Sequence, residues 1–156
     1  MKINLTQNKN FKLFKIISKV AQENNQTVYI VGGYVRDLLM QRKAPTDIDF
    51  VTEQSGIELA KAVGKELGDL KVSVFKTYGT AMIKYQDLDL EFVGARKESY
   101  SEDSRKPAVE TGTLEDDQKR RDFTVNALAI SLNAENFGEL IDPFNGREDM
   151  QNKILR

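Results

Sequence analysis

Apolar residues recur at every third or fourth position in several stretches of the chain, and this spacing predicts amphipathic helices. The stretches are residues 10–23, 34–42, 57–67, 115–132 and 147–156. Gly68 directly follows the third stretch, where a glycine commonly ends a helix. The stretch 115–132 has the strongest helical pattern, with Phe123, Leu128 and Leu132 among its apolar positions.

Shorter runs, either apolar or alternating, lie between these stretches and predict five strands. They are residues 27–31, 48–51, 72–75, 80–85 and 88–93, and the last two are spaced as a hairpin. Residues 95–117 are polar and show little periodicity, so we expect a functional or mobile loop there. The order of the elements predicts an α/β (α+β) domain in which helices flank a mixed five-stranded sheet.

Composition restricts the chemistry. The 156 residues include no cysteine and no histidine, which excludes disulfides, thiolate nucleophiles and serine–histidine catalysis. Any metal would need oxygen ligands, which favours Mg²⁺, Mn²⁺ or Ca²⁺. The net charge of −1 argues against a globally basic nucleic-acid binder, although local basic clusters occur. Without a secretory signal or an apolar run long enough to cross a bilayer, we expect a cytoplasmic protein with no membrane partner.

Two aspartates stand one residue apart where a strand is expected to begin. Alternation along a strand places Asp47 and Asp49 on one face and turns Ile48 and Phe50 to the other. Two carboxylates on one face can bind one or two Mg²⁺ ions, but they are also typical of a solvated strand start. Asp87, Asp89 and Glu91 alternate on the last predicted strand, where each is either a third metal-site acid or a solvent-facing residue.

Two further clusters accompany the aspartates. Gly32-Gly33 separates a strand from a helix that carries Arg36, an arrangement that suits either a phosphate contact or an ordinary tight turn. Near the end of the chain, Asp122 and Asn126 are four residues apart and share a face if the segment is helical. With Arg121 beside them they could meet one ligand, or they could form surface ion pairs.

The joint pattern resembles a known family. The stretches "GGYVRDLLMQRKAPTDIDFV" and "DDQKRRDFTVNALAI" resemble the first two signature motifs of the tRNA nucleotidyltransferase / bacterial poly(A) polymerase family, in the same order and spacing. "LEFVGARKESY" resembles the intervening strand of the family, and "IDPFNGREDMQNKILR" resembles its hinge motif. The resemblance extends from Thr27 to Arg156.

The resemblance implies a DNA-polymerase-beta-like nucleotidyltransferase head domain with specific residue roles. Asp47 and Asp49 would hold the catalytic Mg²⁺ (or Mn²⁺) ions, and Glu91 is a candidate third carboxylate. The triphosphate would contact Gly32, Gly33 and Arg36, while Arg121 and Asp122 would read the ribose and Asn126 would lie at the nucleotide. Residues 99–114 would form a flexible loop beside the site.

The implied activity is addition of CCA, or part of it, to the 3′ end of tRNA from CTP and ATP. A poly(A) polymerase head and a non-catalytic metal- or nucleotide-binding module are the alternatives. Residues 1–140 would be the head domain, and residues 141–156 would be the hinge and the start of a neck helix. In the family, base selection and tRNA binding depend on neck, body and tail segments that follow this region, so we expect residues 1–156 to lack them.

Overall fold

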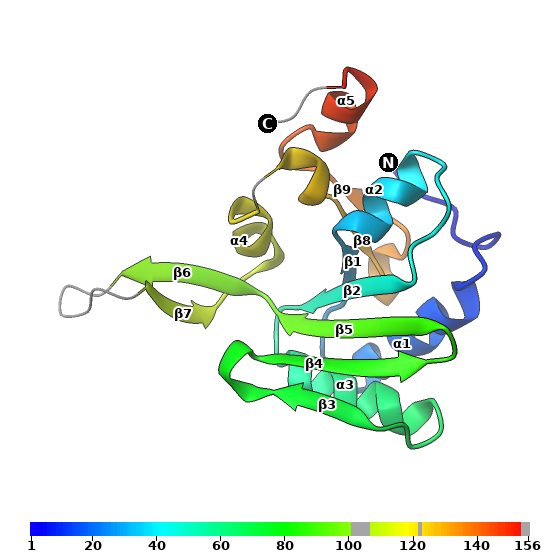
Figure 1. Cartoon of the computed structure of the whole chain (residues 1–156), viewed down its shortest axis with the longest axis vertical. Coiled ribbons are helices and arrows are strands. Elements are labelled where there is room, and N and C mark those ends of the chain that lie inside the picture. The colour runs from blue at the N-terminus through cyan, green and yellow to red at the C-terminus, as the bar shows by residue number, and fades with distance from the viewer. Residues whose placement is uncertain (101–106, 122, 154–156) are drawn as a thin grey trace.

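A seven-stranded mixed sheet organises the fold (Figure 1). The computed structural model describes residues 1–100, 107–121 and 123–153. The strand order is β3-β4-β5-β2-β1-β8-β9, and only β2 and β5 run parallel to each other. The strands are β1 (Tyr29–Val31), β2 (Asp47–Thr52), β3 (Val72–Phe75), β4 (Thr80–Tyr85), β5 (Leu88–Gly94), β8 (Ala129–Ser131) and β9 (Leu140–Ile141).

One face of the sheet is covered by two helices and holds the main core. The predicted helices are confirmed as α1 (Phe11–Glu23) and α3 (Gly56–Glu66), which lie behind the sheet in Figure 1. Phe14 of α1 packs edge-on against Phe50 of β2, which stacks on Phe92 of β5. Ser55 caps α3 by accepting the Glu58 amide, and Gly68 follows the helix end with φ +113°. The alternation predicted for β2 is therefore correct, because Ile48 and Phe50 are fully buried on this face.

The strongest helical prediction is wrong in its second half. Helix α4 (Leu114–Lys119) is short, and it is followed by a 3-10 turn, η2 (Thr124–Asn126), and then by strand β8. Leu128, Ile130 and Leu132 are buried, a spacing of two that suits a strand as well as a helix. Antiparallel pairing of β8 with β1 and β9 decides between them, and it raises the strand count above the predicted five.

The polar stretch that we expected to be a loop forms a second, two-stranded sheet. Strands β6 (Arg96–Tyr100) and β7 (Pro107–Thr111) pair antiparallel, from Arg96 opposite Thr111 to Tyr100 opposite Pro107. Figure 1 shows this ribbon extending away from the main sheet. Its strands are mostly polar and lack the apolar alternation that would predict them. The middle of the proposed flexible loop, residues 101–106, lies outside the described residues.

Short elements complete the chain around the sheet. Helix α2 (Gly33–Leu39) follows β1, as predicted, and α5 (Gly146–Gln151) begins the last helical pattern. The other short elements are the 3-10 turns η1 (Lys76–Tyr78) and η3 (Ala134–Asn136). None of the helices in the described segments has the length and apolarity required to cross a membrane.

The second face of the sheet is only partly covered. Leu114 of α4 packs there against Val31 and Val51 in a small apolar cluster. Across the remaining surface, the register aligns Val31, Asp49, Glu91 and Met82 in one row over β1, β2, β5 and β4. The fold therefore presents two carboxylates on the open face, beside a helix that supplies basic residues.

Candidate active site

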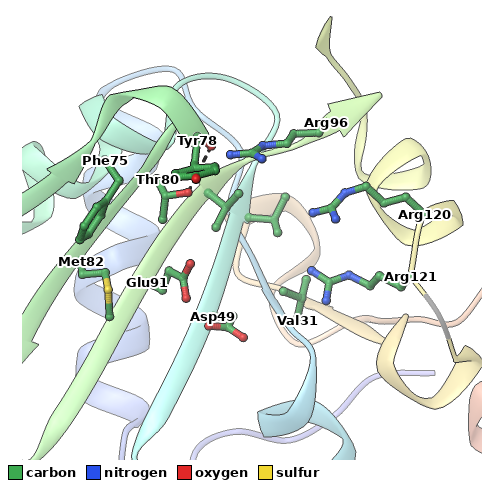
Figure 2. Close-up of a pocket in the computed structure, with 12 residues that line it drawn as sticks. Val31, Asp49, Phe75, Tyr78, Thr80, Met82, Glu91, Arg96, Arg120 and Arg121 are labelled. Atoms are coloured by element: carbon green, nitrogen blue, oxygen red, sulfur yellow. Dashed lines mark hydrogen bonds between the residues drawn. The ribbon is translucent and has the colours of Figure 1, made fainter. Parts of the chain in front are cut away.

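Four of the candidate acidic residues come from two adjacent parallel strands. Asp49 and Glu91 are direct register partners on β2 and β5, and Figure 2 shows both side chains on the open face. Asp47 is exposed and lies two residues earlier on β2. Asp89, the register partner of Asp47, pairs instead with Lys84 at 3.7 Å. Asp49 and Glu91 are therefore the carboxylates that the fold brings closest to the centre of the face.

The electrostatic environment of Asp49 is unfavourable for its charge. Burial and the neighbouring Glu91 carboxylate raise the pKa of Asp49 from 3.8 to about 6, although Arg121 opposes this shift. Asp47 contributes further repulsion. Near neutral pH, Asp49 is mostly ionised and faces another carboxylate, and such a pair is stabilised by added positive charge.

The glycine pair lies directly beside these carboxylates. Gly32 has φ +74° and ψ −143°, a conformation that side chains with a Cβ rarely adopt. A Cβ on Gly32 would be 3.5 Å from Oδ2 of Asp49 and 3.8 Å from Nη1 of Arg121. A glycine is therefore needed here for its backbone conformation, and no side chain of its own separates the turn from the acids and the arginine.

Arg36 links the glycine turn to the later motif. One guanidinium nitrogen of Arg36 donates to the Asn126 side-chain oxygen at 3.1 Å, and its Nε donates to Asp37 at 3.0 Å. A Cβ on Gly33 would be only 3.2 Å from the Arg36 guanidinium, so this group lies over the turn. The structure thus brings together Arg36 and Asn126, which are ninety residues apart in the chain.

A buried aspartate that sequence reasoning missed holds the two arginines of the Lys-Arg-Arg run. Asp117 on α4 is fully buried and accepts from Arg120 through Oδ1, at 2.8 and 3.1 Å. Its Oδ2 accepts from Nε of Arg121 at 3.1 Å and forms an ion pair with Nη2 of Arg121 at 3.0 Å. Arginines three and four residues after an acid on a helix predict such pairs, and that signal was available in the sequence. Asp117 therefore orients Arg121 toward Asp49 and Gly32.

The helix expected to carry both Asp122 and Asn126 ends at Lys119, and Asn126 belongs to a 3-10 turn, so the shared face of these two residues stays a prediction. Asp122 itself lies outside the described residues. Asn126 still reaches the site through Arg36.

The open face forms a hollow of about 480 Å³ around the carboxylates. Figure 2 shows Arg96, Arg120 and Arg121 extending into it from one side, and Phe75, Tyr78 and Met82 lining the other. Sequence reasoning missed Phe75 and Tyr78, because the helical and strand patterns assign apolar residues to the core by default. It recognised Arg96 only as part of a local basic cluster with Lys97.

A divalent cation fits the donor set at the carboxylates. Within the described parts of the chain, no three acidic side chains form a ready-made metal cluster. A protein site for Mg²⁺ commonly supplies only one or two carboxylates, and water and substrate phosphates provide the remaining oxygens. Asp49 and Glu91 supply such a pair, and their mutual repulsion is relieved by a bound cation.

Comparison with known proteins places the site in context. Residues 28–156 match the family described as poly A polymerase head domain. An A-adding tRNA nucleotidyltransferase from Aquifex aeolicus is 47% identical over 128 residues, covering 82% of this chain and 15% of that protein. A CCA-adding enzyme from Lactobacillus helveticus is 39% identical over 130 residues, covering 82% of this chain and 30% of that protein.

Solved structures agree with the sequence comparison. The crystal structure of a tRNA nucleotidyltransferase complexed with a primer tRNA and an incoming ATP analog superposes with a TM-score of 0.78 at 42% identity. The match covers 90% of this chain and 38% of that one. The chain described here therefore spans between about one seventh and two fifths of the length of these similar proteins.

Proposed function

The chain belongs to the family of poly A polymerase head domains, and on that premise we propose that it is the catalytic head of a tRNA nucleotidyltransferase. The proposed reaction adds CCA, or only part of it, to tRNA 3′ ends from CTP and ATP. Both A-adding and CCA-adding enzymes are among its relatives. The observation that carries the proposal is that Asp49, Gly32 and Arg121 meet at one point of the open face.

The proposed chemistry is a single nucleotidyl transfer. The 3′-oxygen of the RNA forms a bond to the α-phosphorus of the nucleotide, and the bond from that phosphorus to the bridging oxygen breaks to release pyrophosphate. Mg²⁺, held by Asp47 and Asp49 with Glu91 as the third acid, would lower the pKa of the attacking hydroxyl and neutralise the leaving phosphates. Mn²⁺ could replace it, since it favours the same oxygen ligands.

The basic residues around the carboxylates provide the binding part of the proposal. Gly32 and Gly33 place no side chain between the main chain and the acids, and Arg36 and Arg121 would supply charge for the triphosphate. Asn126, which accepts from Arg36, would contact the nucleotide, and Arg121 with Asp122 would read the ribose. Each arginine is already held by a side chain of the protein, so little ordering is needed when the anion binds.

We also propose that residues 1–140 form the head and that residues 141–156 form the hinge and the start of a neck. Asp142 accepts the amides of Gly146 and Arg147 at 2.7 and 3.0 Å and so fixes the turn that starts α5. Thr124 donates to Asp149 at 2.5 Å, which joins α5 to the 3-10 turn beside the site. This contact would couple the neck to the nucleotide pocket.

The test is nucleotide addition by the full-length protein that carries this chain. The substrates are tRNA lacking its 3′-terminal nucleotides, labelled CTP and labelled ATP. We expect Asp47→Ala and Asp49→Ala to abolish addition and to leave tRNA binding intact. Asp87→Ala is the matched control, because Asp87 is exposed at the turn before β5 and should be dispensable. Wild-type rates in either test variant would refute the metal assignment.

The length of the product separates the related activities. A single added A supports the A-adding reaction, addition of CCA supports the complete one, and a long A tract supports a poly(A) polymerase, to which the family description also applies. Cation and nucleotide binding without any addition by the full-length protein would support a non-catalytic module.

A further inference from the structure

The hollow extends from the carboxylates to the turn between β3 and β4, where two aromatic rings are exposed. Tyr78 is 64% exposed and Phe75 is 47% exposed, and both line the hollow. The described residues include only five exposed large apolar side chains: Met1, Met40, Phe75, Tyr78 and Phe123. Two of them therefore lie on one short turn that faces the reaction centre, a concentration typical of a binding surface.

The local backbone fixes this turn without burying the rings. Gly79 takes a left-handed conformation with φ +63° and ends the 3-10 turn that contains Tyr78. The hydroxyl of Thr80, the first residue of β4, donates to the Tyr78 carbonyl at 3.2 Å and adds a second contact that holds the turn. The ring is therefore presented by an ordered backbone, so a ligand that stacks on it pays little ordering cost.

Arg96 stands next to these rings. The Arg96 guanidinium lies 3.8 Å from the point where a Cβ on Gly79 would sit, and Figure 2 shows it beside Tyr78. Among the residues that the structure describes, no acidic side chain forms an ion pair with Arg96. A guanidinium with no ion pair to any described side chain, beside exposed aromatic rings, suits single-stranded nucleic acid, which offers a phosphate and a stacking surface together.

The position of the aromatic turn relative to the carboxylates indicates which part of a substrate would contact it. Phe75 pairs with Thr80, which pairs with Val93 two residues beyond Glu91, so across two strand spacings Phe75 lies roughly 12 Å from Glu91. Gly32 and Arg36, the proposed triphosphate contacts, lie on the opposite side of Asp49, toward β1 and α2. An RNA whose 3′-hydroxyl lies at the carboxylates would therefore extend its last bases toward the aromatic turn.

We propose that Phe75, Tyr78 and Arg96 form a binding shelf for the 3′-terminal bases of the RNA that accepts the nucleotide. A base stacks on the Tyr78 ring, and Arg96 contacts the adjoining phosphodiester. This inference rests on the proposed nucleotidyl transfer and assigns its RNA subsite. The base of the incoming nucleotide has the same stacking chemistry, so the test must distinguish the two sources.

The test measures RNA and nucleotide binding separately on the same variants. A fluorescein-labelled single-stranded RNA octamer ending in CC with a free 3′-hydroxyl is titrated by anisotropy, and ATP with Mg²⁺ is titrated by calorimetry. Stacking contributes roughly 1–3 kcal/mol per base, so Tyr78→Ala should weaken RNA binding by about 5- to 150-fold. Tyr78→Phe should retain it, and Thr77→Ala, an exposed neighbour in the same turn, should change nothing.

The arginine adds an independent measurement. Arg96→Gln should reduce the slope of log K against log[salt] by about 0.7, the loss of one phosphate contact to a single strand. Equal RNA affinity for Tyr78→Ala and wild type, or no RNA binding by wild type, would overturn the shelf. So would weaker ATP binding with unchanged RNA binding, because the shelf would then hold the incoming base. If the wild-type protein does not bind ATP, the proposed function is refuted, but the RNA titration still tests the shelf.

Discussion

Removing the charge of Asp117 should disturb the site without touching any substrate contact. The carboxylate is fully buried, accepts two hydrogen bonds from Arg120 and one from Arg121, and forms a second, ionic contact with Arg121 at 3.0 Å. In Asp117→Asn, one oxygen remains to accept from one arginine, while the new amide group turns its own N–H donors toward the other. We therefore expect Arg121 to lose the orientation that brings it to Asp49 and Gly32.

The size of the effect follows from the kind of contact that is lost. Hydrogen bonds to a charged group contribute about 1.5–3 kcal/mol, and a buried partner left unpaired costs more. Both arginines retain some solvent exposure, which compensates part of the loss. We expect Asp117→Asn to lower the free energy of unfolding by about 2 kcal/mol and the Tm by roughly 4–8 °C.

Two measurements separate positioning from simple destabilisation. Thermal unfolding by circular dichroism gives the stability loss, and ATP binding is measured at 20 °C, where the variant stays folded. We expect about tenfold weaker ATP binding, which equals the loss of about 1.4 kcal/mol of contact with Arg121.

Glu115→Gln is the matched control for this prediction. Glu115 pairs with Lys119 on the same helix at 3.3 Å, but the two side chains are 68% and 58% exposed. Such a pair contributes about 0.5 kcal/mol or less, so both measurements should stay near wild type. If Asp117→Asn behaves like Glu115→Gln, other contacts hold the arginines and the reasoning is wrong.

Two more predictions concern the carboxylates and the glycine turn. Because the pKa of Asp49 is raised to about 6, the folded state binds the proton more tightly than the unfolded state, and stability is lost as the pH rises through 6. The pKa shift corresponds to at most ~3 kcal/mol of destabilisation and, after solvent screening, to ~1 kcal/mol. Without divalent ions, Asp49→Asn should therefore raise the Tm by about 2–4 °C at pH 8 and by less at pH 5. An equal change in Tm at both pH values would contradict this. Gly32→Ala should lower the free energy of unfolding by about 1–3 kcal/mol and also weaken ATP binding, because the new Cβ would approach Asp49. Gly68→Ala is the control, because a Cβ there meets open space and should affect stability alone. Equal ATP affinity in the two variants would count against the proposed role of the glycine turn.

Local periodicity predicted those parts of the fold in which one face of an element is buried. The helices at 10–23 and 57–67 and the strands at 80–85 and 88–93 agree closely with the structure, because each has a single apolar face against the same core. Residues 129–131 form a strand because they pair with β1, about a hundred residues earlier in the chain. No window of local sequence contains that partner, so a helix and a strand remained equally compatible with the pattern.

Some residues of the candidate site could likewise be predicted from local sequence, and others could not. Gly32, Arg36 and Asp49 lie in one sequence motif, and the structure brings them close to Asn126 and Arg121 from the second motif. Phe75 and Tyr78 could not be recognised, because sequence alone does not show that an aromatic residue stays exposed. Their importance depends on register, which aligns β3 and β4 with the strands that carry the acids.

The charges of the site indicate that the cation and the nucleotide bind together. Asp49 faces Glu91 and has Asp47 nearby, and the nearest opposing charge, Arg121, is already shared with the buried Asp117. One shared guanidinium does not offset this repulsion, since the pKa of Asp49 stays raised despite it. A divalent cation would neutralise the acids, and a triphosphate would then find Arg36 and Arg121 on the same side. The protein's own charges therefore favour binding of cation and nucleotide together over binding of either alone, which calorimetry can test as tighter ATP binding in the presence of Mg²⁺.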